Sequence, residues 1–207
     1  MDTTRVLICH DGGGRNTAAM ARRVARGVES VPGCEAVLRA VAPLAPANAP
    51  RGPEVPATGA PYAEPGDLAD CDGLILGTPT HFGNMSASLK GFLDRTTSQW
   101  FAGALAGKPA AAFTSTGSLH GGQETTLVSM MLPLLHHGAL IVGLPYTNPE
   151  LMTTRSGGTP YGASHVSGEG GDRELDDAEA ALCAALGARV ARAAVALGRA
   201  RRAGNGP

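Results

Sequence analysis

Residues 73–86 read Gly73-Leu74-Ile75-Leu76-Gly77-Thr78-Pro79-Thr80-His81-Phe82-Gly83-Asn84-Met85-Ser86, an apolar run that passes directly into a polar loop. An uninterrupted apolar run ending in Gly, Thr and Pro predicts a buried parallel strand over residues 72–78. The apolar residues of 85–97 recur at helical spacing, and Asn84 or Ser86 can cap that helix. Because ligands of open α/β sheets bind beyond the carboxyl ends of the strands, this loop is expected to hold a ligand.

The same alternation extends in both directions along the chain. Four further short apolar runs predict strands, and amphipathic segments between them predict helices. The expected strands are 5–9, 34–41, 109–115 and 139–144, and the last helix is expected over 172–203. This pattern predicts an α/β fold, a doubly wound five-stranded parallel sheet with helices on both faces. At 207 residues, the chain 1–207 is expected to form a single domain.

A glycine-rich loop, residues 10–17, follows the first predicted strand and opens a helix. Such a loop offers free N–H groups and the positive end of a helix dipole, which together favour a phosphate. Asn16 or Thr17 can cap the helix. Asp11 would repel a phosphate unless Arg15 or His10 compensates its charge, and Arg15 can also bind the phosphate itself. The alternative is a flexible glycine turn that binds nothing.

A third polar loop, residues 115–122, follows the fourth predicted strand. Its small residues allow close approach to a flat ring. The three loops leave strands one, three and four, and are therefore expected to converge on one site.

Several motifs resemble the WrbA-type NAD(P)H:quinone oxidoreductases, a family with the flavodoxin fold. The run G-T-P-T-x-F-G-N-M-S over 77–86 resembles the family's flavin-loop signature. Three further runs follow in the family's order: Ser115-Thr116-Gly117 leading to Gly121-Gly122-Gln123-Glu124, then His136-His137-Gly138, then Gly157-Gly158-Thr159-Pro160-Tyr161-Gly162. The resemblance covers most of the chain and is weakest at the start, where Asp11 replaces the family's usual hydroxyl residue.

The resemblance implies FMN as cofactor and NADH or NADPH as electron donor. It implies that a quinone, or a related aromatic molecule, is reduced by hydride transfer through the flavin. Two catalytic candidates follow from it: Trp100 lines the substrate pocket, and His136 contacts the flavin region across a subunit boundary. The expected cofactor-binding residues are Asp11, Gly12, Gly13, Gly14, Arg15, Asn16, Thr17, Pro79, Thr80, His81, Phe82, Gly83, Asn84, Ser115, Thr116, Gly117, Ser118, Leu119, His120, Gly121 and His136.

Other functions remain open at this point. Leu119 and His120 stand where the family has glycines, which suggests a pathway-specific reductase of a polycyclic aromatic ketone or quinone. A flavin-binding electron carrier or redox sensor is a second alternative. A flavodoxin-like domain that has lost FMN is a third, and Asp11 is its support.

Two segments are expected to lie outside the regular fold. Residues 43–66 contain seven of the fifteen prolines and are predicted to form a surface loop. Residues 146–168 are rich in Gly, Ser and Thr and are predicted to be a long non-helical insertion. The resemblance assigns this insertion to assembly and site closure, and implies a homodimer or homotetramer.

Composition bounds the remaining classes of function. Seventeen basic and eighteen acidic side chains give a formal charge of −1, so no nucleic-acid or membrane partner is expected. No stretch is expected to be apolar enough to span a bilayer. Four scattered cysteines indicate reduced thiols in a cytoplasmic protein. Adjacent histidines point to different sides of a helix, so no metal site is expected at His136 and His137.

Overall fold

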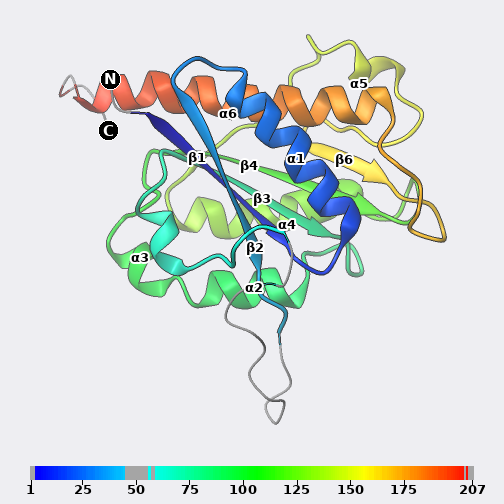
Figure 1. The fold of residues 1–207 in the computed structure, drawn as a ribbon, viewed down its shortest axis with the longest axis horizontal. Helices are drawn as coiled ribbons and strands as arrows, with labels where there is room; N and C mark the ends of the chain where they lie inside the picture. The colour runs from blue at the N-terminus through cyan, green and yellow to red at the C-terminus, as the bar shows by residue number, and fades with distance from the viewer. Residues whose placement is uncertain (1–2, 45–55, 57–58, 203, 205–207) are drawn as a thin grey trace.

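A computed structural model of the chain describes residues 3–44, 56, 59–202 and 204. Its centre is a parallel sheet in the order β2-β1-β3-β4-β5, with β6 also paired to β4 (Figure 1). This is the flavodoxin-like strand order, as predicted. The strands are β1 (Thr4–Asp11), β2 (Cys34–Val41), β3 (Gly73–Pro79), β4 (Pro109–Thr116), β5 (Leu140–Ile141) and β6 (Ala163–Val166).

Helices cover both faces of this sheet, which also agrees with the prediction (Figure 1). The helices are α1 (Arg15–Glu29), η1 (Pro65–Leu68), α2 (Ala87–Asp94), α3 (Thr97–Phe101), α4 (Gln123–His136), α5 (Glu150–Thr153) and α6 (Asp177–Arg202). Strand residues alternate between the two faces, so β1 sends Val6 and Ile8 toward α1 and α6, and Leu7 toward α2 and α4. The buried apolar side chains form one hydrophobic core on each face of the sheet. Because the strands are parallel, the carboxyl ends of β1, β3 and β4 lie at the same edge of the sheet.

The fifth strand differs from its predicted range, 139–144. Only Leu140 and Ile141 form β5, which pairs with the start of β4. The chain then leaves the sheet, and the insertion packs closely against Gly143. A Cβ added at Gly143 would lie 2.4 Å from the carbonyl oxygen of Pro160. After the insertion, β6 pairs with the end of β4. The fifth position of the sheet is therefore divided between two short strands.

The segment 146–168 is consequently not the wholly irregular, non-helical insertion that composition suggested. It contains the short helix α5, and its end is the buried strand β6. Of the predicted loop 43–66, residues 45–55 and 57–58 lie outside the described residues. At the end of this segment, Tyr62 forms an isolated parallel β-bridge with Ala40 of β2, and the helix η1 follows.

Two helices also differ from their predicted form. The helix expected over 85–97 spans only Ala87–Asp94, and a separate short helix, α3, follows and carries Trp100. The helix α6 begins at Asp177, five residues later than predicted. Residues 177–200 of α6 are, contrary to expectation, long and apolar enough to cross a membrane by length and composition alone. The core helix of a globular fold passes the same test, and Leu182, Leu186 and Val190 of α6 are fully buried against the sheet and α1.

Candidate functional site

The three predicted loops leave neighbouring strands and contact one another. Thr80 donates its backbone N–H to the carbonyl of Ser115 at 2.8 Å, which ties the second loop to the third. The side chain of Ser86 donates to the carboxylate of Asp11 at 2.5 Å, which ties the first loop to the second. The structure therefore brings these loops together at one edge of the sheet, as the sequence predicted.

The N-terminus of α1 is available to bind an anion. Among the described residues no side chain caps this helix, and its first turn carries no acidic residue. Asn16 and Thr17, the predicted caps, are engaged elsewhere: Asn16 donates to the carbonyl of Gly171, and Thr17 donates to the carbonyls of Gly14 and Asp11. The first N–H groups of a helix have no partner within the helix, so residues 15–17 offer donors to a phosphate. This geometry fits the phosphate of FMN.

Asp11 is held by neutral groups and not by the predicted cations. It is buried, and its carboxylate accepts from Ser86 and from the backbone N–H of Gly13 at 2.9 Å. Arg15 donates instead to the carbonyl of Asp172 at 2.8 Å. The ring of His10 contacts the carbonyl of Asp11 and not its carboxylate, and burial lowers the pKa of His10. Neither Arg15 nor His10, the two groups that could compensate the charge of Asp11, hydrogen-bonds its carboxylate in this structure.

The second loop projects an exposed tip. His81 and Asn84 exchange backbone hydrogen bonds, and Phe82 and Gly83 between them have positive φ angles of 53° and 76°. The ring of Phe82 is fully exposed. A positive φ is costly for a residue other than glycine, and such residues concentrate at ligand-binding sites. Ser86, one of the two predicted caps, accepts from the N–H of Leu89 and caps α2.

The third loop begins with buried residues and continues with exposed ones. Ser115 and Thr116 are buried, and the hydroxyl of Thr116 donates to the carbonyl of Ser118. Gly117, Ser118, Leu119 and His120 are exposed. The small residues Gly117 and Ser118 suit the close approach of a flat ring.

Trp100 and His136 lie together but away from these loops. The indole N–H of Trp100 donates to the carbonyl of His136 at 2.7 Å. Both line a cavity of about 430 Å³ between α2, α3 and the end of α4. Since His136 is thirteen residues beyond Gln123 on α4, it lies about 20 Å along the helix axis from the third loop. One chain therefore does not bring the two catalytic candidates to its own loops.

His137, to which the sequence analysis gave no role of its own, also lines this cavity. Its side chain is buried, and its Nε2 contacts the hydroxyl of Thr96 at 3.1 Å. Thr96 already donates to the carbonyl of Leu93, so Nε2 is the donor and carries the proton. Nδ1 has no partner among the described residues. Burial, with the neighbouring His136, lowers the pKa of His137 and so favours the neutral ring.

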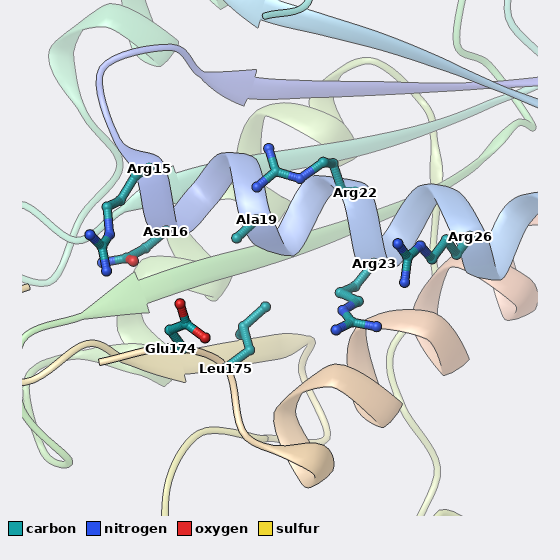
Figure 2. Close-up of a pocket in the computed structure, with 8 residues that line it drawn as sticks. All are labelled: Arg15, Asn16, Ala19, Arg22, Arg23, Arg26, Glu174 and Leu175. Carbon is teal, nitrogen blue, oxygen red and sulfur yellow. The ribbon is translucent and has the colours of Figure 1, made fainter. Parts of the chain in front are cut away.

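Two further cavities flank the start of α1. One, of about 570 Å³, lies between the glycine loop, β2 and Tyr62. The other, of about 400 Å³, is a groove between α1 and the segment before α6 (Figure 2). Its lining includes four arginines of α1, Arg15, Arg22, Arg23 and Arg26. Arg15, Arg22 and Arg26 are spaced at i, i+7 and i+11, which places their Cβ atoms along one side of the helix, and this spacing is the signal in the sequence that could have found them.

Among the described residues, no three His, Cys, Asp or Glu side chains are grouped so as to hold a metal ion.

Comparisons with known proteins agree with this geometry. Residues 5–148 match the family model for NADPH-dependent FMN reductase. A protein of Chromohalobacter salexigens described as "NAD(P)H dehydrogenase (quinone)" is 40% identical over 198 residues, which cover 94% of this chain and 98% of that protein. A WrbA-like flavodoxin structure from Agrobacterium tumefaciens is 27% identical with a TM-score of 0.66, and the match covers 94% of this chain and 99% of that one. An archaeal flavodoxin structure, 16% identical with a TM-score of 0.62 over 93% of this chain and 99% of its own, shares the fold.

The chain belongs to the NADPH-dependent FMN reductase family. Its predicted resemblance to the WrbA-type oxidoreductases is confirmed by the 40% identical relative and by the WrbA-like structure. An oxidoreductase that uses FMN with NADH or NADPH is confirmed at the level of the family. The individual cofactor-binding and catalytic residues remain predictions.

Proposed function

We propose that this protein is an FMN-dependent NAD(P)H:quinone oxidoreductase. The observation that carries the proposal is the uncapped N-terminus of α1, which lies at the same sheet edge as the loops 78–84 and 115–122. A phosphate at the helix start and a flat ring over the two neighbouring loops account for all three loops together.

The cofactor supplies the redox chemistry, and the protein supplies binding, orientation and electrostatics. The N–H groups of residues 15–17 hold the phosphate. The exposed backbone of residues 117–120 donates toward the ring and stabilises negative charge that develops there. Phe82, at the tip of the second loop, shields the ring from water. No side chain has to form a covalent bond.

A second copy of the chain completes the substrate pocket in this proposal. His136 lies about 20 Å along α4 from the third loop, and Trp100 is hydrogen-bonded to it, so both lie away from that loop of their own chain. Beside them, α4 exposes three apolar side chains, Val128, Leu132 and Leu135. An exposed apolar patch of this kind is typical of a protein interface. We therefore propose a homodimer or homotetramer in which Trp100 and His136 serve the partner's flavin.

Truncation of Trp100 tests the substrate role. Trp100→Ala should raise the KM for a benzoquinone about tenfold and leave the FMN content unchanged, because the lost contact is with substrate. The conservative variant Trp100→Phe keeps an aromatic ring and should retain most of the affinity. Equal KM values in Trp100→Ala and the wild type would exclude Trp100 from the pocket.

A pathway-specific reductase of a polycyclic aromatic ketone or quinone is the second candidate. Leu119 and His120 favour it because both are exposed on the third loop, where they narrow access to a ring. A kcat/KM at least tenfold higher for an anthraquinone than for a benzoquinone would support it, and the reverse order would exclude it.

We place either enzyme in the cytoplasm, since Cys9, Cys71 and Cys183 are buried free thiols.

A further inference from the structure

The cavity between the glycine loop, β2 and Tyr62 carries polar groups that the proposed flavin site does not use. Its volume, about 570 Å³, is that of a small-molecule site. Among the described residues, those of the loops 78–84 and 115–122 do not line it, so the flavin ring is expected elsewhere. Residues 12–14 form one wall, which places the cavity beside the site of the flavin phosphate. The cavity is therefore a neighbour of the flavin site and can hold a second ligand.

His10 contributes an unused hydrogen-bond acceptor to this cavity. The residue lines the cavity and is only 5% exposed. Its Nδ1 lies 3.0 Å from the carbonyl oxygen of Asp11, and since a carbonyl only accepts, Nδ1 carries the proton. Burial lowers the pKa of His10 and so favours the neutral ring, in which Nε2 is an acceptor. Nε2 has no hydrogen bond with a described residue. Among the described residues, the one fully buried side-chain N or O without a partner is His137 Nδ1, so Nε2 of His10 is open to the cavity.

Arg22 brings a positive charge to the same cavity. Its side chain points away from Glu174 and Leu175, which lie on the other side of α1 (Figure 2). It forms no hydrogen bond or ion pair with a described residue. Burial is the main cause of the lowered pKa of His10, and the charge of Arg22 also lowers it, so these two side chains lie near each other. The described lining residues include no Asp or Glu, so an anion from outside the chain is the partner that Arg22 lacks.

The other walls favour an aromatic carboxylate over a phosphate. Leu38 and Ala40 of β2, with Tyr62 beside them, give the cavity apolar surface that suits a flat ring. Arg15, the second cation of the lining, is engaged by the carbonyl of Asp172. One guanidinium fork therefore remains, and it matches the single charge and the two oxygens of a carboxylate.

We infer that this cavity binds an aromatic carboxylate that carries a hydroxyl group, with the carboxylate on Arg22 and the hydroxyl donating to Nε2 of His10. A phenolic hydroxyl stays protonated at neutral pH, as that of tyrosine does, so it can donate to Nε2. The site goes beyond the proposed function, because its ligand neither replaces the flavin nor exchanges electrons with it.

Calorimetric titration of the FMN-loaded protein with 4-hydroxybenzoate tests the site. We expect it to bind at least about tenfold more tightly than 4-methoxybenzoate, which has no hydroxyl donor, and than 4-hydroxybenzyl alcohol, which has no carboxylate. In Arg22→Gln the advantage over the alcohol should disappear. Arg26→Gln removes an exposed charge from the same helix outside this cavity and should keep the advantage. No binding of 4-hydroxybenzoate, equal binding of the three compounds, or an unchanged advantage in Arg22→Gln would overturn the inference.

The role of His10 is tested by the ¹H–¹⁵N NMR spectrum of the imidazole rings. The Nε2 resonance of His10, assigned by its loss in His10→Gln, should shift on saturation with 4-hydroxybenzoate and stay in place with 4-methoxybenzoate. An unshifted resonance would overturn the placement of the hydroxyl. Binding that occurs only in the absence of FMN would place the ligand in the flavin phosphate site and would also overturn the inference. A protein that takes up no FMN but binds 4-hydroxybenzoate through Arg22 would retain this site and refute only the proposed function. Thermal melting of each variant confirms that it is folded.

Discussion

Asp11 is the residue at which this chain departs most clearly from a simple phosphate loop. The structure places its carboxylate between two neutral donors, Ser86 Oγ and Gly13 N, and so fixes its charge close to the start of α1. The hydrogen bonds shape the loop, but they leave the negative charge uncompensated. The same carboxylate is therefore expected to stabilise the conformation of the loop and to lower its affinity for FMN.

The variant Asp11→Asn separates the effect of the charge from the effect of the hydrogen bonds. The amide oxygen still accepts from Gly13 N and the amide nitrogen approaches Ser86, while the charge that opposes the phosphate is removed. We predict that FMN binds about tenfold more tightly, a change of about 1.4 kcal/mol in binding free energy. Quenching of flavin fluorescence on titration with apoprotein measures the dissociation constant.

Asp70→Asn is the matched control, because Asp70 is exposed in the turn before β3, at the opposite edge of the sheet. It should leave the dissociation constant unchanged. An Asp11→Asn protein that is folded and binds FMN no more tightly than the wild type would show that the charge of Asp11 does not limit affinity.

At the scale of elements, one buried ionic network holds β6, the insertion and α6 together. Glu179 of α6 is fully buried and accepts from His165 of β6 at 2.9 Å. It also accepts from the backbone N–H of Gly157 and Val166 and from Arg173. Burial opposes the ionised form, but these hydrogen bonds outweigh it and lower the pKa of Glu179 to about 2. The late, short strand β6 depends on this carboxylate.

The lowered pKa predicts a pH dependence of stability. A folded-state pKa of about 2 against the usual 4.5 means that Glu179 stabilises the fold above pH 4.5, and that this contribution is lost as the pH falls toward 2. We predict that Glu179→Gln lowers the free energy of unfolding at pH 7 by about 3 kcal/mol, because it removes the carboxylate that pairs with Arg173 and with the buried His165. It should also flatten the decline of stability between pH 4.5 and 2. Urea unfolding at several pH values measures both effects.

Glu169→Gln is the comparison for this prediction, since Glu169 is an exposed carboxylate in the same region. It should change neither the stability at pH 7 nor its decline in acid. If Glu179→Gln kept the wild-type decline between pH 4.5 and 2, the network would not be the origin of the acid sensitivity.

The close approach of the insertion to β4 gives a second prediction at this scale. A Cβ at Gly162 would lie 2.2 Å from the carbonyl oxygen of Ala112, within the backbone of the central sheet. We predict that Gly162→Ala lowers the free energy of unfolding by about 2 kcal/mol through overpacking. At Gly66 an added Cβ meets nothing within 4 Å, so Gly66→Ala should be nearly neutral in the same urea titration. Similar stabilities of the two variants would contradict the described contact.

The elements show which parts of the fold the sequence could predict. The strand Cys34–Val41 was predicted with its observed bounds, because Val37, Leu38 and Val41 give it an apolar character that ends at the proline-rich stretch from Pro43. The strand β6 was missed because its four residues, Ala163–Val166, contain polar Ser164 and His165, whose partners Gln123 and Glu179 are distant in the chain. Local patterns do not record such long-range pairings.

The candidate site likewise contains parts that the sequence predicts and parts that it does not. The three loops were predicted because each directly follows an apolar run and is rich in Gly, Ser or Thr. The role of Ser86 as a partner of Asp11 was not, since 75 residues separate them. The basic groove was also missed, because the segment that carries Glu174 meets α1 only in the folded chain.

At the scale of the whole molecule, the proposed shared pocket, in which the Trp100 cavity of one chain serves the loops of another, gives a prediction about assembly. We predict that Leu132→Lys/Leu135→Lys, which places two charges on the exposed apolar face of α4, dissociates the oligomer. FMN should remain bound, because the three loops belong to one chain, while quinone reduction should fall at least about tenfold. Analytical ultracentrifugation and flavin absorbance measure these two properties separately.

Ala196→Lys adds a charge to an exposed position of α6 and should change neither the sedimentation nor the activity. A double variant of α4 that sediments as the wild type does, or that dissociates and keeps full activity, would contradict the shared pocket.

The most direct test of the central claim is the absorbance spectrum of the purified protein with FMN, before and after addition of NADPH and then of a benzoquinone. We predict a yellow protein whose flavin band is bleached by NADPH and restored by the quinone. A protein that stays colourless after incubation with FMN would contradict the flavin site, and the flavodoxin-like domain without FMN would take its place. A flavin band that bleaches with NADPH but is not restored by the quinone would contradict quinone reduction and favour an electron carrier or redox sensor.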